Sequence, residues 1–198
     1  MDCFWTPSAW CGTNSFTSGY STDEKYFGAK SLIINVASYE GDSRGRVYQD
    51  FSSTELKPGG IYTLSGYVKT VGVANSSNVN SGAFICAESV NSDGTTTTFH
   101  SDYVKGNTST SVDGGWQRVS VTFKVPENSV KTRIHLALRT STGKVFFDGV
   151  QLELYSVANN CNLLENAGFE EGSGGWTGEY SNLNSSTDNI TSTSTYLK

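Results

Sequence analysis

Short segments in which apolar and polar residues alternate most constrain how this chain can fold. In residues 61–69 the apolar side of the pattern is formed by Tyr62, Leu64, Gly66 and Val68. Residues 117–125 repeat the pattern with Val119, Val121, Phe123 and Val125, and residues 133–139 with Ile134, Leu136 and Leu138. Successive side chains of a β-strand point to opposite faces, so each segment is predicted to be a strand with one face in a core.

Further strands are expected at residues 31–38, 46–52, 83–89, 97–103 and 144–154. No segment keeps a helical period, and Gly, Asn, Asp and Ser fill the expected turns. About eight to ten short strands of this kind predict an all-β chain, folded as an antiparallel β-sandwich of the jelly-roll type.

The charge of the chain limits its partners. Its 198 residues carry a net charge of −5, only 17% of them are charged, and no run of Lys or Arg occurs. Nucleic-acid binders need a basic surface, so nucleic acid is not an expected partner. No apolar stretch reaches the about 20 residues of a membrane span, so membrane insertion is not expected either. The N-terminus, M-D-C-F-W-T, shows no secretion signal.

The cysteines are widely spaced, at Cys3, Cys11, Cys86 and Cys161. They form no C-x-x-C pair and no cluster with histidine, so a zinc site is not expected. Four cysteines allow three disulfide pairings, and the sequence does not choose among them. Cys86 lies in the apolar run A-F-I-C-A and is expected to be a buried free thiol.

A fragment of the chain occurs twice, once near each end. Residues 162–178 read N-L-L-E-N-A-G-F-E-E-G-S-G-G-W-T-G, and residues 4–12 read F-W-T-P-S-A-W-C-G. The alignment pairs Phe4 with Phe169, Trp10 with Trp176 and Gly12 with Gly178. We therefore expect one module over residues 1–157 and the opening segment of a second repeat over residues 158–198. That segment is too short for a core of its own, and its polar part, 181–195, would be disordered in isolation.

The order of several motifs resembles a known family. G-A-K-S-L is followed by V-Y-Q-D-F, K-P-G-G-I-Y-T-L-S-G-Y-V-K, G-W-Q-R-V-S-V-T-F-K-V-P and G-K-V-F-F-D-G-V-Q-L-E. This series resembles the carbohydrate-binding modules of families 4, 9 and 22, which are jelly rolls found in tandem in bacterial cell-surface or wall-associated proteins. The resemblance covers most of residues 1–155 and restarts near Asn162. It implies a non-catalytic module of an extracellular or cell-surface protein that binds a polysaccharide or other glycan.

The resemblance also implies a structural Ca²⁺ held by Asp148, Glu170 and the backbone carbonyl of Lys30. In the first copy of the fragment, Trp5 stands where the second copy has Glu170. One interpretation is that calcium is absent and Asp148 caps a turn. The other is that residues 162–171 supply the missing first strand and Glu170. They would do so within one chain or by exchange between chains, which would give a strand-exchanged homo-oligomer.

Sugar binding requires flat aromatic faces and side chains that hydrogen-bond to hydroxyl groups. The resemblance places the ligand on the outer face of one sheet, and the outward candidates are Tyr67, Lys69, Glu88, His135 and Arg139. Weaker candidates are Tyr48, Gln49 and Tyr103. The alternative is that an outward tyrosine is ordinary strand surface and that Lys69, Glu88 and Arg139 form ion pairs.

The chain is not expected to be an enzyme. A glycosidase needs two carboxylates at one cleft, and no motif among the acidic residues indicates such a pair. Neither a G-x-S-x-G elbow nor a nucleophile near His100 or His135 can be identified. The serious alternative to sugar binding is a structural or adhesive spacer in a tandem-repeat surface protein. Exposed aromatic residues gathered on one outer face would favour sugar binding.

Overall fold

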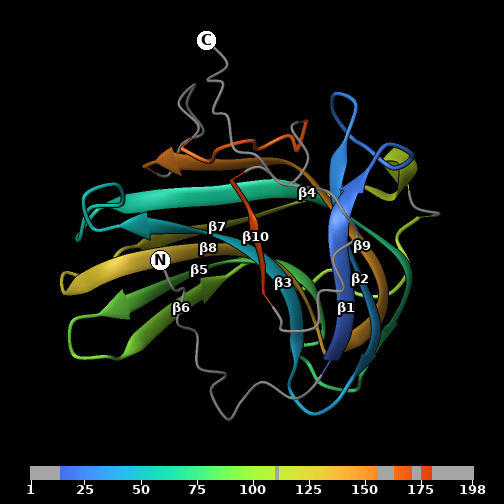
Figure 1. The fold of residues 1–198 in the computed structure, drawn as a ribbon, viewed down its shortest axis with the longest axis horizontal. Coiled ribbons are helices and arrows are strands. Elements are labelled where there is room, and N and C mark those ends of the chain that lie inside the picture. The colour runs from blue at the N-terminus through green and yellow to red at the C-terminus, as the bar shows by residue number, and fades with distance from the viewer. Residues whose placement is uncertain (1–13, 110–111, 156–162, 171–174, 180–198) are drawn as a thin grey trace.

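A computed structural model describes residues 14–109, 112–155, 163–170 and 175–179. In these residues the chain forms two antiparallel five-stranded sheets packed face to face (Figure 1). Sheet A has the order β1-β2-β9-β4-β7 and sheet B the order β10-β3-β8-β5-β6. The strands are β1 (Asn14–Ser21), β2 (Ser31–Tyr39), β3 (Arg44–Ser52), β4 (Ile61–Asn75), β5 (Gly82–Asn91), β6 (Thr96–His100), β7 (Gln117–Lys124), β8 (Ser129–Arg139), β9 (Ser141–Leu154) and β10 (Thr177–Glu179).

The predicted fold class is confirmed. Among the described residues, the only helical piece is a 3₁₀ turn at Val112–Gly115. None of the described helical segments is long and apolar enough to cross a lipid bilayer. Strands β1 and β10 were not predicted from the alternation of residues. Cys86 is a buried free thiol, as expected, and burial raises the pKa of its thiol.

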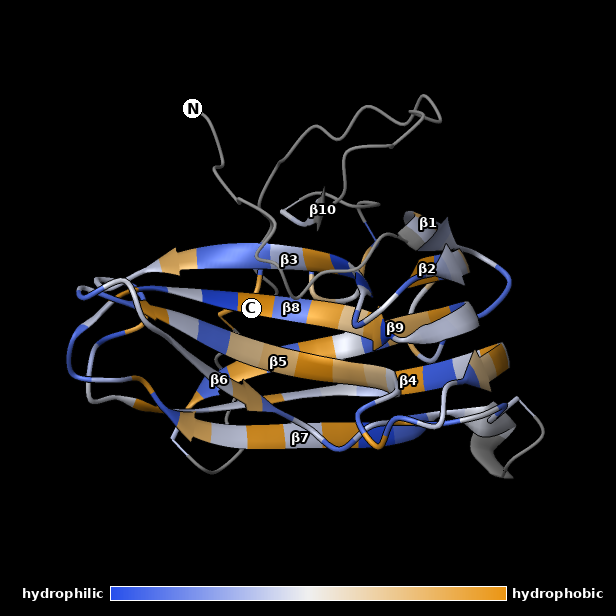
Figure 2. Cartoon of the chain, turned by 90° about the horizontal axis from the view of Figure 1, so that it is seen from below, coloured by the Kyte–Doolittle hydropathy of each residue, from blue (hydrophilic) through white to orange (hydrophobic). Residues whose placement is uncertain are grey.

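One hydrophobic core fills the space between the two sheets. Its members include the residues that the alternation assigned to buried faces, among them Leu64 of β4, Phe123 of β7 and Leu136 of β8. Figure 2 shows the same pattern as alternating hydrophobic and hydrophilic bands along the strands. Burying a large apolar side chain contributes about 1.5–3 kcal/mol, so this shared core is what holds sheet A against sheet B.

The C-terminal part of the chain packs on the same sandwich. Leu164, Phe169 and Trp176 belong to the core cluster, and β10 pairs antiparallel with β3 at the edge of sheet B. The predicted boundary between residues 157 and 158 lies outside the described residues, so the division into two repeats stays a prediction. Also outside are the first copy of the fragment, Cys3, Cys11, Cys161 and the polar stretch 181–195.

Candidate functional site

The five predicted ligand-binding residues fall on two different faces. Tyr67 and Lys69 lie on the outer face of sheet A, where they pair with Asp148 and Phe146 of β9. Glu88 of β5 and His135 and Arg139 of β8 belong to sheet B. Their side chains alternate with core residues and therefore point away from the interior. The five residues do not form one site, because the thickness of the sandwich separates the two groups.

The loop between β1 and β2 lies over the outer face of sheet A and is fixed there by Asp148. One oxygen of this carboxylate, Oδ2, accepts hydrogen bonds from the backbone N–H groups of Tyr26 at 2.7 Å and Phe27 at 2.8 Å. The other oxygen, Oδ1, accepts the N–H of Gly149 at 2.7 Å. Asp148 is therefore more than the cap of one turn, because it joins strand β9 to a loop far away in the sequence.

Glu170 holds the other end of this loop. Its Oε1 accepts the N–H groups of Ala29 at 2.9 Å and Lys30 at 3.0 Å, and its Oε2 also accepts that of Ala29 at 3.0 Å. The ammonium group of Lys30 donates to the backbone carbonyl of Glu170 at 2.5 Å. Gly28 adopts a left-handed φ of 56°, and a Cβ at this position would overlap the Glu170 carboxylate.

Two consecutive residues of this loop form an aromatic cluster with Tyr67. The ring of Tyr26 stacks on that of Tyr67, with centroids 3.9 Å apart and planes 21° apart. The ring of Phe27 meets both edge-on, at 4.6 Å from Tyr26 and 5.5 Å from Tyr67. We call Tyr26, Phe27 and Tyr67 the aromatic platform. It faces solvent, because Tyr26 is 38% and Phe27 53% exposed.

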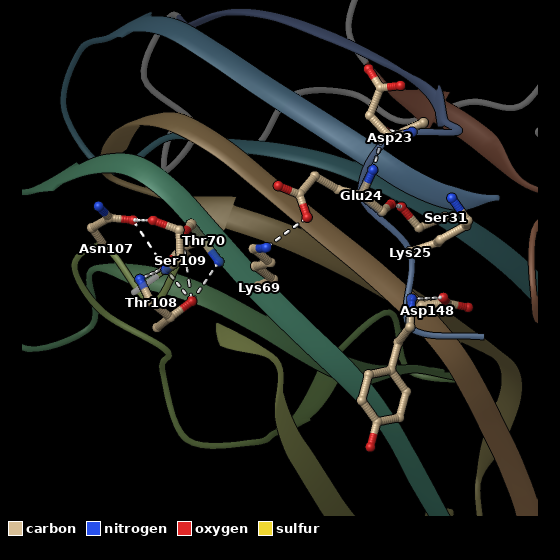
Figure 3. Close-up of polar contacts among 12 residues, drawn as sticks. Asp23, Glu24, Lys25, Ser31, Lys69, Thr70, Asn107, Thr108, Ser109 and Asp148 are labelled. Atoms are coloured by element: carbon tan, nitrogen blue, oxygen red, sulfur yellow. Dashed lines mark hydrogen bonds and ion pairs between the residues drawn. The ribbon is translucent and has the colours of Figure 1, made fainter. Parts of the chain in front are cut away.

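Hydrogen-bonding groups surround the platform. The guanidinium group of Arg118 lies 5.4 Å from the centroid of the Tyr67 ring and donates to Ser65 and Gln151 at 3.0 and 3.2 Å. The pKa of the Tyr67 phenol is lowered, first by its hydrogen bond with Arg118 and second by its hydrogen bond with Tyr26. Lys69 forms an ion pair with Glu24 at 2.6 Å, and Figure 3 shows the two side chains reaching toward each other.

The predicted calcium ligands come together, but their hydrogen-bonding groups are occupied. Burial raises the pKa of Asp148, the three backbone hydrogen bonds oppose this shift, and the charge of Glu170 adds to it. Ca²⁺ takes about six to eight oxygen ligands, whereas the described residues contain no cluster of three or more His, Cys, Asp and Glu side chains. Calcium binding by Asp148, Glu170 and the backbone carbonyl of Lys30 therefore stays a prediction.

The outer face of sheet B is built differently, around His135. Arg46 Nη1 lies 3.3 Å from His135 Nδ1, and because arginine only donates, Nδ1 must be the acceptor and Nε2 must carry the proton. Burial, then the charges of Arg46, Arg44 and Arg133, holds the pKa of His135 well below its usual range. Within the described residues, His135 Nε2 and Glu88 Oε1 are buried without a hydrogen-bond partner.

Two arginines of this face, Arg139 and Arg133, form ion pairs. Arg139 binds Asp42 through two hydrogen bonds, one of them Nε to Oδ1 at 2.6 Å, and donates to the Tyr103 hydroxyl at 3.0 Å. Arg133 donates to both oxygens of Asp50, at 2.7 and 2.9 Å. The ion-pair interpretation is confirmed for Arg139 and, through Glu24, for Lys69. Glu88 has no ion pair among the described residues.

The predicted ligand-binding residues differ in exposure. His135 is 0%, Glu88 4% and Lys69 7% exposed, so these three side chains offer little surface to a ligand in this structure, and their role in binding stays a prediction. The aromatic platform is accessible, and it is the better candidate site. The sequence identified Tyr67 and Lys69 but missed Tyr26 and Phe27, because these two lie in a loop that has no periodic pattern. The adjacent aromatic pair just before G-A-K-S was the available signal.

Comparison with solved structures places this fold among carbohydrate-binding modules. A xylan-binding domain of family 22 has a TM-score of 0.53 at 12% identity, covering 78% of this chain and 92% of its own. The C-terminal family 22 module of Clostridium thermocellum Xyn10B has a TM-score of 0.51 at 12% identity, covering 78% and 90%. The chain therefore has the jelly-roll β-sandwich fold of these carbohydrate-binding modules, as the motif order predicted.

Curated relatives resemble the chain in sequence over a small part of their length. The tRNA nuclease WapA of Bacillus subtilis (strain 168) is 26% identical over 156 residues, which is 75% of this chain. The tRNA(Glu)-specific nuclease WapA of Bacillus subtilis subsp. natto (strain BEST195) is 26% identical over 159 residues. The chain spans 6% of the length of each of these proteins. No family model matches the sequence.

Proposed function

We propose that this chain is a non-catalytic carbohydrate-binding module of a secreted or cell-surface protein, and that it binds a polysaccharide at the aromatic platform. The observation that carries the proposal is the exposure of two neighbouring aromatic rings, Tyr26 and Phe27, on a face that also offers hydrogen-bonding side chains. Exposed aromatic rings gathered on one face are a typical feature of a binding surface. The fold shared with carbohydrate-binding modules supports the same conclusion.

The chemistry of the platform suits a pyranose ring. One face of a pyranose presents C–H groups, which pack against the electron-rich face of an aromatic ring. The hydroxyl groups at the sugar edge need donors and acceptors, and Arg118, Gln151 and the Lys69–Glu24 pair lie beside the rings. Lys69 and Glu24 neutralise each other, so the charge of Arg118 is the one left beside the rings.

The platform is also organised before any ligand arrives. Asp148 fixes the backbone of Tyr26 and Phe27, and the stacking of Tyr26 on Tyr67 limits rotation of both rings. A rigid site loses less conformational entropy when it binds.

The test is binding of the purified chain to a panel of plant, fungal and bacterial wall polysaccharides, measured by affinity electrophoresis and calorimetry. Phe27→Ala and Tyr67→Ala should each weaken binding by about two- to tenfold, since stacked aromatic contacts contribute on the order of 0.5–1.5 kcal/mol. Tyr103→Ala, which removes an aromatic ring from sheet B, is the matched control and should leave the affinity unchanged. Circular dichroism would confirm that each variant is folded.

The other outcomes are equally informative. If Tyr103→Ala abolishes binding and the platform variants do not, the ligand lies on the outer face of sheet B and the platform assignment is wrong. If folded wild-type chain binds none of the polysaccharides, the proposal fails and the spacer alternative stands.

A further inference from the structure

We propose that the sandwich carries a binding site for the opening segment of an adjacent repeat, so that neighbouring modules are joined by strand donation. This site, here called the seat, is formed by strand β3 with Gln49 and by residues 28–30. Residues 163–170 and 175–179, here called the donor segment, are predicted from the sequence to open a second repeat. By packing they belong to the first sandwich. This inference goes beyond sugar binding and does not depend on it.

Three large apolar side chains of the donor segment are buried by the sandwich. Leu164, Phe169 and Trp176 are buried in the shared core, and Phe169 is 0% exposed. The rings of Phe169 and Trp176 lie against each other with centroids 5.3 Å apart. The Trp176 indole donates to the carbonyl of Asn166 at 3.3 Å. A segment that loses this much apolar surface to a neighbouring core is an integral part of that core.

The seat matches the backbone of the donor segment as well. Strand β10 extends sheet B by pairing Thr177, Gly178 and Glu179 with β3, which is the way a peptide adds to an exposed sheet edge. The side-chain amide of Gln49 donates to the carbonyl of Glu165 at 2.8 Å and accepts its N–H at 3.4 Å. Gln49 therefore binds the segment as a neighbouring strand would.

The seat is also selective for charge. Two backbone N–H groups, those of Ala29 and Lys30, point at the carboxylate of Glu170, and Gly28 leaves the space that the carboxylate fills. The first copy of the fragment has Trp5 at this position, and tryptophan has no acceptor for these donors. The seat should therefore bind the second copy of the fragment more tightly than the first, because only the second has a carboxylate that accepts these N–H groups.

Strand donation would also link one repeat to the candidate site of the previous one. Glu170 binds the loop that carries Tyr26 and Phe27, so an adjacent repeat would help to order the aromatic platform. This last consequence rests on the proposed function, whereas donation itself does not.

The experiment supplies the donor segment from outside. The full chain carrying Phe169→Ala and Trp176→Ala keeps the seat but loses its own anchors, and it is mixed with a fluorescein-labelled synthetic peptide of residues 162–180. Fluorescence anisotropy should show binding to this variant at least about tenfold tighter than to wild-type chain, whose seat is filled. The melting temperature of the variant should rise with peptide concentration. A peptide with the same two alanines is the control, and a peptide with Glu170→Trp should bind more weakly than the natural one.

The experiment tests strand donation whether or not the double-alanine variant folds without the peptide. If the variant is unfolded alone, recovery of the wild-type circular dichroism spectrum on adding the natural peptide supports donation as strongly as a rise in melting temperature. Donation is overturned if a large excess of the natural peptide changes neither the anisotropy, the spectrum nor the melting temperature. Because no glycan is present, failure of this test is independent of any failure of sugar binding.

Discussion

The carboxylate of Asp148 accepts the backbone N–H of Tyr26 at 2.7 Å across 122 residues of sequence. This contact fixes the loop between β1 and β2 on strand β9 and sets the Tyr26 ring against Tyr67. It connects an acidic residue that the resemblance assigned to calcium with an aromatic residue that the sequence analysis did not select. The relationship explains why an exposed loop carries a rigid aromatic surface.

Replacing Asp148 by alanine should destabilise the protein, because it leaves the N–H groups of Tyr26, Phe27 and Gly149 without their acceptor. We expect a loss of about 1–3 kcal/mol in the free energy of unfolding, measured by urea denaturation. Asp23→Ala, in the same loop but exposed, is the matched control and should change stability by less than about 0.5 kcal/mol. Equal effects of the two substitutions would show that the Asp148 contacts do not hold the loop.

Gly28→Ala should be destabilising for two separable reasons. The residue has a left-handed φ of 56°, and its new Cβ would displace the Glu170 carboxylate. Gly94→Ala is the control, because Gly94 has a φ of 80° with no atom near the added Cβ, so it measures backbone strain of about 1 kcal/mol alone. Thermal unfolding should show a larger loss for Gly28→Ala, and similar losses would mean that Glu170 moves aside freely.

Glu170→Gln tests the charge of the clamp on Ala29 and Lys30. The neutral amide keeps one acceptor but turns an N–H group toward the loop amides, so we expect a loss of about 1 kcal/mol in stability. The measurement is thermal unfolding of wild type and variant, each with EDTA and with added Ca²⁺. A melting temperature of the wild type that rises with Ca²⁺, and does not rise in the variant, would establish the predicted calcium site. Equal curves with and without the ion would reject it.

Stability should fall as the pH is lowered below about 6.5, the usual pKa of histidine. His135 has a strongly lowered pKa in the folded state, so the unfolded chain binds the proton first, and each lowered pH unit favours unfolding by up to about 1.4 kcal/mol. Its charged neighbours are Arg44, Arg46 and Arg133, which all disfavour the imidazolium. The pKa of Asp148 is raised, so its contribution has the opposite sign at more acidic pH.

The check on this prediction is an NMR titration of the two imidazole rings, with unfolding curves of wild type and His135→Gln. The His135 resonances should stay constant through the pH range in which histidine usually titrates. The pH dependence of stability should be weaker in His135→Gln. A His135 ring that titrates near its usual pKa in the folded protein would contradict the buried neutral imidazole.

Much of the fold could be predicted because local alternation reports directly on burial. The expected strand at residues 117–125 became β7 (Gln117–Lys124), and that at residues 61–69 became the first part of the longer β4 (Ile61–Asn75). Strand β10 was missed, because it exists only through its pairing with β3. A strand of three residues has no pattern to detect.

The candidate site was only half predictable. Tyr67 and Lys69 stood out because they face outward on a regular strand, and the structure leaves Tyr67 in the platform. Glu88, His135 and Arg139 lie on the other sheet and do not form one site with them. Alternation shows that a residue points out of a sheet, but it does not show to which sheet the strand belongs. Nor does it show whether an outward position stays exposed, and His135 does not.

The sequence by itself determined most of the strands, much of the core and the β-sandwich class, because these follow from the side on which each apolar residue falls. The tertiary structure alone decided that Tyr26 meets Tyr67, that Asp148 holds the Tyr26 loop, and that Phe169 and Trp176 complete a core begun more than a hundred residues earlier. Such contacts depend on the three-dimensional packing of distant segments. The residues next to each of these positions in the sequence do not predict that packing.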